Sequence, residues 1–219
     1  PTVDLSTKTI DGQGSGNFTS NISFQKTNQN ITFYVRAYAT NIIGTGYGPQ
    51  VSFKNMATGN GVTDIDGNKY NSIIINGQEW MTENLKTTKY CNGDLIPNLT
   101  KNTEWGNTNS GAWSNYNNVS TNNNTYGKLY NWFAVSDNRN ICPCGWKVPS
   151  NNEWKQFTNY LNSTVFIYGK SIASNILWNN STTAYAVGNN LLENNSSKFS
   201  ALPGGERVYT GEFFLNINK

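Results

Sequence analysis

Residues 146–161 read Trp-Lys-Val-Pro-Ser-Asn-Asn-Glu-Trp-Lys-Gln-Phe-Thr-Asn-Tyr-Leu. Ser150 and Glu153 stand three positions apart and form a capping box, in which each side chain binds a free backbone N–H at the start of a helix. Pro149 disfavours helical backbone before that point. The large apolar side chains that follow recur at helical spacing and share one face: Trp154, Phe157, Tyr160 and Leu161. The stretch therefore predicts a helix near 150–161 that packs on a sheet.

Tight turns before this helix predict the sheet. Residues 61–70 have a hairpin pattern with Asp66-Gly67 at the turn, and Asn76-Gly77 marks a second turn after a strand over 70–75. These dipeptides are preferred in two-residue hairpin turns because they tolerate positive φ. From there to residue 150 the chain is rich in Asn, Gly, Ser and Thr, and its embedded aromatic residues predict short strands and ordered loops. A weaker helical pattern covers residues 170–177.

The first 55 residues read as all-β. Side chains alternate with a period of two along residues 31–39: Phe33, Val35, Ala37 and Ala39 share one face, and Thr32, Tyr34, Arg36 and Tyr38 share the other. Turn residues over 41–48 and a closing strand over 50–54 follow. The short polar stretch 56–60 reads as a linker to a second domain.

The composition favours an extracellular protein and argues against nucleic-acid binding. Charged residues make up 13% of the 219 residues, the net charge is only +3, and the basic residues are scattered rather than clustered. Abundant small polar residues suit turns and exposed loops, while 36% hydrophobic residues suffice for a packed core. No apolar run approaches the ~20 residues of a membrane helix. The first residues carry no signal peptide, so we expect the chain to begin inside a longer precursor.

The cysteines allow a disulfide but not a conventional metal or nucleophilic site. The sequence has three cysteines, Cys91, Cys142 and Cys144, and no histidine. The lack of histidine excludes a Cys/His zinc site and a Cys-His catalytic pair. In an oxidising compartment Cys91 can pair with Cys142 or with Cys144, leaving one thiol spare. Free thiols throughout are the alternative.

Two further features of the sequence concern metal binding and catalysis. Asp64-Ile-Asp66-Gly-Asn68 is similar to the start of a calcium loop, but the EF-hand pattern needs a Glu at its twelfth position, where this chain has Ile75. A hairpin turn is the favoured interpretation, and calcium is the one cofactor left open. We expect no catalytic residues, because the chain shows neither a nucleophile elbow nor a phosphate-binding glycine loop.

Two family resemblances complete the sequence picture. Tyr34-Val-Arg-Ala-Tyr-Ala-Thr-Asn, followed by Val51-Ser-Phe, resembles the last strands of a fibronectin type III-like domain from Bacteroidota surface proteins. From residue 61 the chain resembles the Fibrobacter succinogenes major paralogous domain. The second resemblance rests on Gln78-Glu-Trp-Met-Thr-Glu-Asn-Leu, Tyr126-Gly-Lys-Leu-Tyr-Asn-Trp, Cys142-Pro-Cys-Gly-Trp-Lys-Val-Pro-Ser and Ala201-Leu-Pro-Gly-Gly.

The second family is related to C-type-lectin-like folds, including the formylglycine-generating enzymes, whose paired catalytic cysteines have no matching segment here. The resemblances imply a mostly β chain with an α+β second domain. Residues 1–55 would be the last strands of a partial β-sandwich, 56–60 a linker, and 61–219 an irregular lectin-like domain that is truncated at its C-terminus.

The expected function is adhesion or surface display by a secreted, non-catalytic module of a multidomain bacterial protein. Loop aromatic residues are the candidates for stacking on glycans: Trp105, Trp113, Tyr116, Trp178 and Tyr185. The alternative is a structural spacer or assembly subunit without a small ligand. Expected partners are neighbouring domains, glycans or other surface proteins, and the type IX secretion apparatus, at the extracellular or outer-membrane surface.

Overall fold

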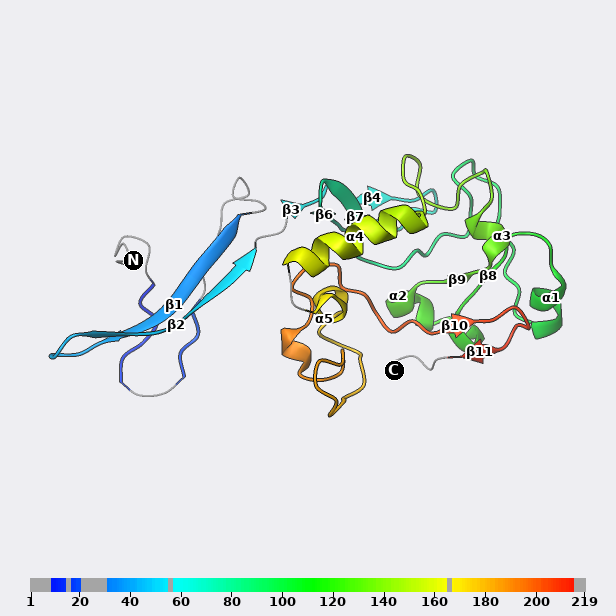
Figure 1. Cartoon of the computed structure of the whole chain (residues 1–219). Helices are drawn as coiled ribbons and strands as arrows, with labels where there is room; N and C mark the ends of the chain where they lie inside the picture. The colour runs from blue at the N-terminus through cyan, green and yellow to red at the C-terminus, as the bar shows by residue number, and fades with distance from the viewer. Residues whose placement is uncertain (1–8, 15–16, 21–30, 55–56, 165–166, 215–219) are drawn as a thin grey trace. The chain divides into compact units, whose positions relative to one another are not determined.

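A computed structural model describes residues 9–14, 17–20, 31–54, 57–164 and 167–214. The chain divides into two compact units, Pro1–Asn55 and Met56–Lys219 (Figure 1). It is a mixed α/β structure with short antiparallel sheets and, among the described residues, five α-helices, of which one is long. No helix in the described part of the chain combines the length and apolar character needed to cross a membrane.

The described part of unit 1 is dominated by one long hairpin. Strands β1 (Thr32–Thr40) and β2 (Thr45–Lys54) pair antiparallel, and a turn over Asn41–Gly44 joins them. The second strand is therefore longer than the sequence predicts, and the turn is shorter. A bulge at Ala37 shifts the register, so Ala37 and Ala39 are exposed while Phe33 and Val35 are half-buried. No β-sandwich forms within residues 9–54 as described, so that part of the expected fold is not confirmed.

Unit 2 begins with the two predicted hairpins. Strands β4 (Val62–Thr63) and β5 (Lys69–Tyr70) flank the Asp66-Gly67 turn. Strands β6 (Ser72–Ile75) and β7 (Gln78–Met81) flank the Asn76-Gly77 turn, where both residues have positive φ. Strand β3 (Ala57–Thr58) pairs with the other edge of β6. The stretch predicted as a linker thus contributes a sheet strand, in which Ala57 is buried.

The long helix α4 (Asn151–Thr164) packs on this sheet, as the sequence predicts (Figure 1). Ser150 Oγ accepts a hydrogen bond from the Glu153 N–H, and the Glu153 carboxylate accepts from the Ser150 N–H at 2.9 Å, which confirms the capping box. Phe157 and Leu161 are each 1% exposed and form the first core cluster with Ile73, Ile75 and Trp80. Trp154 lies at the rim of this cluster.

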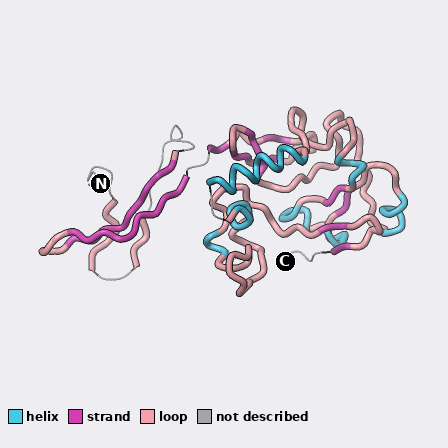
Figure 2. Tube along the Cα trace, viewed as in Figure 1, coloured by secondary structure: helices cyan, strands magenta, loops and turns pink. Residues whose placement is uncertain are grey.

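The rest of unit 2 consists of short elements in ordered loops (Figure 2). The helices are α1 (Asn102–Asn107), α2 (Asn122–Tyr126), α3 (Trp132–Val135) and α5 (Tyr168–Ile172), with 3-10 turns η2 (Tyr116–Asn118) and η3 (Leu191–Glu193). The strands pair as β8 (Trp113–Ser114) with β9 (Leu129–Tyr130) and β10 (Glu206–Arg207) with β11 (Phe213–Phe214). Helix α5 begins and ends earlier than the predicted 170–177, because the chain turns away to pair Ala173 with Ala201.

A second core cluster holds these short elements together. It consists of Tyr90, Ile96, Ala134, Ile141 and Cys142, all at most 4% exposed. These residues come from loops and from helix α3, so the loops are fixed by apolar burial rather than by extended sheet pairing. The expectation of ordered loops pinned by aromatic residues is confirmed.

Candidate functional site

Two of the five candidate aromatic residues belong to the core. Trp105 is 5% exposed, its Nε1 donates to the Val208 carbonyl, and the Arg207 guanidinium lies 4.3 Å from its ring centre. Tyr116 is 3% exposed and packs edge-on against Phe213. The C-terminal hairpin β10–β11 therefore covers both rings, and neither offers a face to a sugar.

The other three candidates are more accessible. Trp113 and Trp178 are half-buried, and their Nε1 groups donate to the carbonyls of Ile96 and Ala201. The Lys128 ammonium lies 4.6 Å from the Trp113 ring centre, so a cation already covers part of that ring. Tyr185 is 65% exposed. The structure places Tyr185 in the loop after Trp178, whereas Trp113 lies on strand β8.

Helix α3 carries an exposed aromatic residue that was not among the candidates. Trp132 is 73% exposed, more than any other tryptophan of this chain, and the adjacent Phe133 is 42% exposed. We call Asn131, Trp132, Phe133 and Ser136 the α3 surface. Because tryptophan is normally well buried, the exposure of Trp132 makes the α3 surface a candidate contact site.

The backbone that presents Trp132 is firmly held. The Asn131 side chain caps α3 by accepting from the Ala134 N–H at 3.0 Å, and it also accepts from the Ala112 N–H at 2.9 Å. Ala134 is fully buried in the second core cluster. Ser136 Oγ donates to the Trp132 carbonyl at 2.8 Å. The ring therefore projects from a rigid support, which limits the entropy lost on binding.

The sequence contains a signal for this surface. Residues 132–135 are four consecutive apolar residues, and a helix of one turn can bury only one side. Since the N-cap Asn131 directs Ala134 into the core, the side chain two positions earlier must point elsewhere. Recognising this requires knowing that the helix is only four residues long, which the sequence does not reveal.

The calcium-like sequence forms a turn whose carboxylates are engaged by the protein itself. Asp64, 7% exposed, accepts from the Tyr70 hydroxyl at 2.6 Å and from the backbone N–H groups of Asp66 and Asn68. Asp66 accepts from Thr88 and pairs with Lys89 at 3.1 Å. Burial, together with Asp64, raises the pKa of Tyr70, which keeps this hydroxyl a donor. These carboxylates support the hairpin turn and do not fit a calcium ion.

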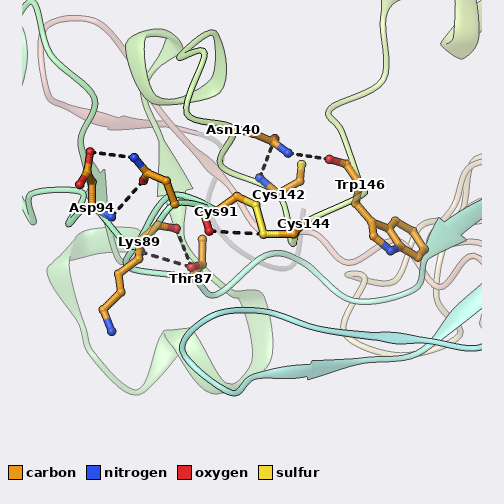
Figure 3. The surroundings of a disulfide bond; sticks show 9 residues. Thr87, Lys89, Cys91, Asp94, Asn140, Cys142, Cys144 and Trp146 are labelled. Carbon is orange, nitrogen blue, oxygen red and sulfur yellow. Dashed lines mark hydrogen bonds between the residues drawn. A yellow bond between two sulfur atoms is a disulfide. The ribbon is translucent and has the colours of Figure 1, made fainter.

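Two of the three cysteines form a disulfide, and the third is a free thiol (Figure 3). Cys91 and Cys144 are bonded, with their Cα atoms 5.4 Å apart, within the usual range for a disulfide. Cys142 is 4% exposed and free, and burial raises the pKa of its thiol to about 11. Asn140 fixes this segment by accepting from the Cys142 N–H and donating to the Trp146 carbonyl. Of the two pairings open to Cys91, the structure has the one with Cys144.

Fold and disulfide together define a small mixed α/β domain, consistent with a secreted or surface protein. The chain belongs to the Fibrobacter succinogenes major domain family, whose family model matches residues 73–218. This domain is typical of surface proteins. No curated protein and no solved structure matches the chain.

Proposed function

We propose that this chain is a non-catalytic, extracellular adhesion module that binds glycans by stacking a sugar ring on Trp132. The exposure of Trp132, at 73%, is the observation that carries the proposal. Aromatic rings supply a large, rigid contact area with few rotatable bonds. Their faces suit the C–H groups of a sugar because the ring face is electron-rich. The Asn131 amide is used within the protein, but Ser136 Oγ, which donates its proton to the Trp132 carbonyl, can still accept a hydrogen bond from a sugar hydroxyl.

The charge of the module supports a neutral glycan over other partners. Charged residues are scarce in the sequence, the four residues of the α3 surface are uncharged, and the charged residues that follow them, Asp137 and Arg139, pair with each other. A protein partner would be expected to cover a broader apolar core than one tryptophan and one phenylalanine. An exposed indole ring is instead about the size of a single sugar unit.

Affinity electrophoresis tests this proposal with neutral soluble polysaccharides, namely mixed-linkage β-glucan, xylan and glucomannan, with and without calcium. We expect the unmodified chain to be retarded by at least one of them. Trp132→Ala should weaken that binding by at least about tenfold, the usual effect of removing a central tryptophan. Trp132→Phe should retain part of it, because a ring remains.

Tyr209→Ala is the matched control, since Tyr209 is 86% exposed but lies on the turn between β10 and β11. It should leave binding unchanged. Replacing an exposed side chain changes the free energy of unfolding by only about 0.5 kcal/mol, so a loss of binding by Trp132→Ala reports the contact and not the fold. Full binding by Trp132→Ala, or no binding by the unmodified chain, would refute the stacking site and favour the structural spacer.

The proposal also concerns the fold of unit 1 and the route of export. Unit 1 would be the end of a fibronectin type III-like domain of a Bacteroidota surface protein, exported by the type IX route and joined to further domains. The β1–β2 hairpin and the disulfide support this reading. A structure of a longer chain that includes the preceding residues tests it, because a sandwich requires further strands packed on β1 and β2.

A further inference from the structure

A groove in unit 2, separate from helix α3, has the features of a second ligand site. It has a volume of about 520 Å³, within the range of small-molecule pockets. Residues 58–63 and 69–73, which pair with each other through β3–β6 and β4–β5, line it together. Thr82 and Lys198 complete the lining. No candidate residue from the sequence lies in this groove.

Two glycines allow the two lining segments to approach each other closely. Gly59 N donates to the Ser72 carbonyl at 2.8 Å, and Gly61 N donates to Ser72 Oγ at 2.7 Å. Gly61 has φ +70°, and a Cβ there would lie 2.7 Å from the Tyr70 carbonyl oxygen. A side chain at Gly59 would collide with Ser72 and Glu79, and one at Gly61 would collide with the Tyr70 backbone. The two glycines thus hold the loop 59–61 close to residues 70–72, and Asn60 is the one side chain that this loop carries.

The charges that line the groove are all positive. Lys69 and Lys198 line it, and no carboxylate does. Among the lysines whose side chains the structure describes, only Lys69, Lys155 and Lys198 have neither an ion pair nor a hydrogen bond, and the others are engaged. Two of these three therefore line the same groove. Lys198 stands at φ +62°, a conformation that favours glycine or asparagine over lysine.

The nearest acidic side chains are occupied by hydrogen bonds within the protein. Glu79 accepts from the Asn60 N–H at 2.7 Å and from Ser72 Oγ at 2.5 Å. Glu83 accepts from the N–H and the side-chain amide of Asn71, both at 2.7 Å. These carboxylates hold the lining segments in place, and neither is within ion-pair distance of Lys69 or Lys198.

We propose that this groove binds an acidic sugar, with Lys69 and Lys198 pairing with the carboxylate of a hexuronic acid. The remaining side chains of the lining support a sugar over a bare anion, since Thr58, Thr63, Thr82, Asn60 and Asn71 carry hydroxyl or amide groups that match sugar hydroxyls. The volume also exceeds what one carboxylate or phosphate ion needs. The inference extends the proposed glycan binding to a second site of different chemistry.

Isothermal titration of the 219-residue chain with an α-1,4-linked galacturonic acid disaccharide, and with the neutral galactose disaccharide of the same linkage, tests the proposal. We expect the acidic disaccharide to bind at least about fivefold more tightly, the combined effect of two exposed charge pairs. Lys69→Gln combined with Lys198→Gln should abolish this preference. Added sodium chloride should reduce it, because exposed pairs are screened by salt. Lys155→Gln, the third unpaired lysine, is the control and should keep the preference.

Three results would overturn the proposal. These are equal binding of the two disaccharides by the unmodified chain, a preference that survives in the double lysine variant, and displacement of the acidic disaccharide by an equal concentration of inorganic phosphate. The last would show a groove that accepts any anion. Trp132→Ala should leave the acidic preference intact, so failure of this groove and failure of the α3 surface are distinguishable.

Discussion

Removal of the Cys91–Cys144 disulfide should lower the stability of unit 2 substantially. The two cysteines are 53 positions apart in the sequence. Cross-linking residues at that separation reduces the entropy of the unfolded chain by about 14 cal/mol/K, which corresponds to about 4 kcal/mol at 25 °C. For a domain of this size such a loss lowers the melting temperature by roughly 8–16 °C. The variant to test is Cys91→Ala combined with Cys144→Ala, because a single substitution would leave Cys142 able to pair with the remaining cysteine.

Tryptophan fluorescence during urea unfolding measures the effect. All seven tryptophans lie in unit 2, so this signal reports on that unit alone. The double variant should unfold at lower urea with a free energy of unfolding reduced by about 4 kcal/mol. A reducing agent should destabilise the unmodified chain by a similar amount and leave the double variant unchanged. Equal stability of the two proteins, or equal sensitivity to the reductant, would refute the cross-link as the source of stability.

Two further changes test the packing and capping of α4. Phe157→Ala removes a ring that is 1% exposed and lies 4.5 Å from the Trp80 ring centre, so urea unfolding should show a loss of about 3–5 kcal/mol; the exposed neighbour Gln156→Ala should change little. The bond from Lys147, followed by those from Ser150, lowers the pKa of Glu153 to about 2. Because the folded-state pKa is depressed, its stabilisation is complete above the ordinary glutamate pKa and disappears as the pH falls through about 2. Glu153→Gln should therefore flatten the loss of stability between about pH 4.5 and pH 2, and an unchanged acid profile would contradict the capping role.

The elements that the sequence predicts well are those determined by neighbouring residues. The capping box at Ser150 and the Asn76-Gly77 turn act within a few positions of the chain, so both appear in the structure where the sequence places them. Strand β3 was missed because two residues are too few to show a period. The bulge at Ala37 was missed because alternation along one strand carries no information on its partner.

The site depends on contacts between distant residues, and these limited the prediction. Trp105 has a polar, loop-like sequence context, yet Arg207, about a hundred positions later, lies over its ring. Trp132 has an apolar context that suggests burial, yet Asn131 and Ala134 fix α3 so that this ring is outside. The choice between Cys142 and Cys144 likewise depends on how loops far apart in sequence meet.

The disulfide also determines how this domain responds to mechanical tension. If a surface module is pulled from both ends, force passes directly from Cys91 to Cys144 through the sulfur–sulfur bond. The intervening chain, which contains helix α3 and Trp132, is bypassed. About 180 Å of backbone contour thus stays locked while the bond is intact. The ring that we propose to hold a sugar therefore sits in a segment that tension along the chain does not stretch.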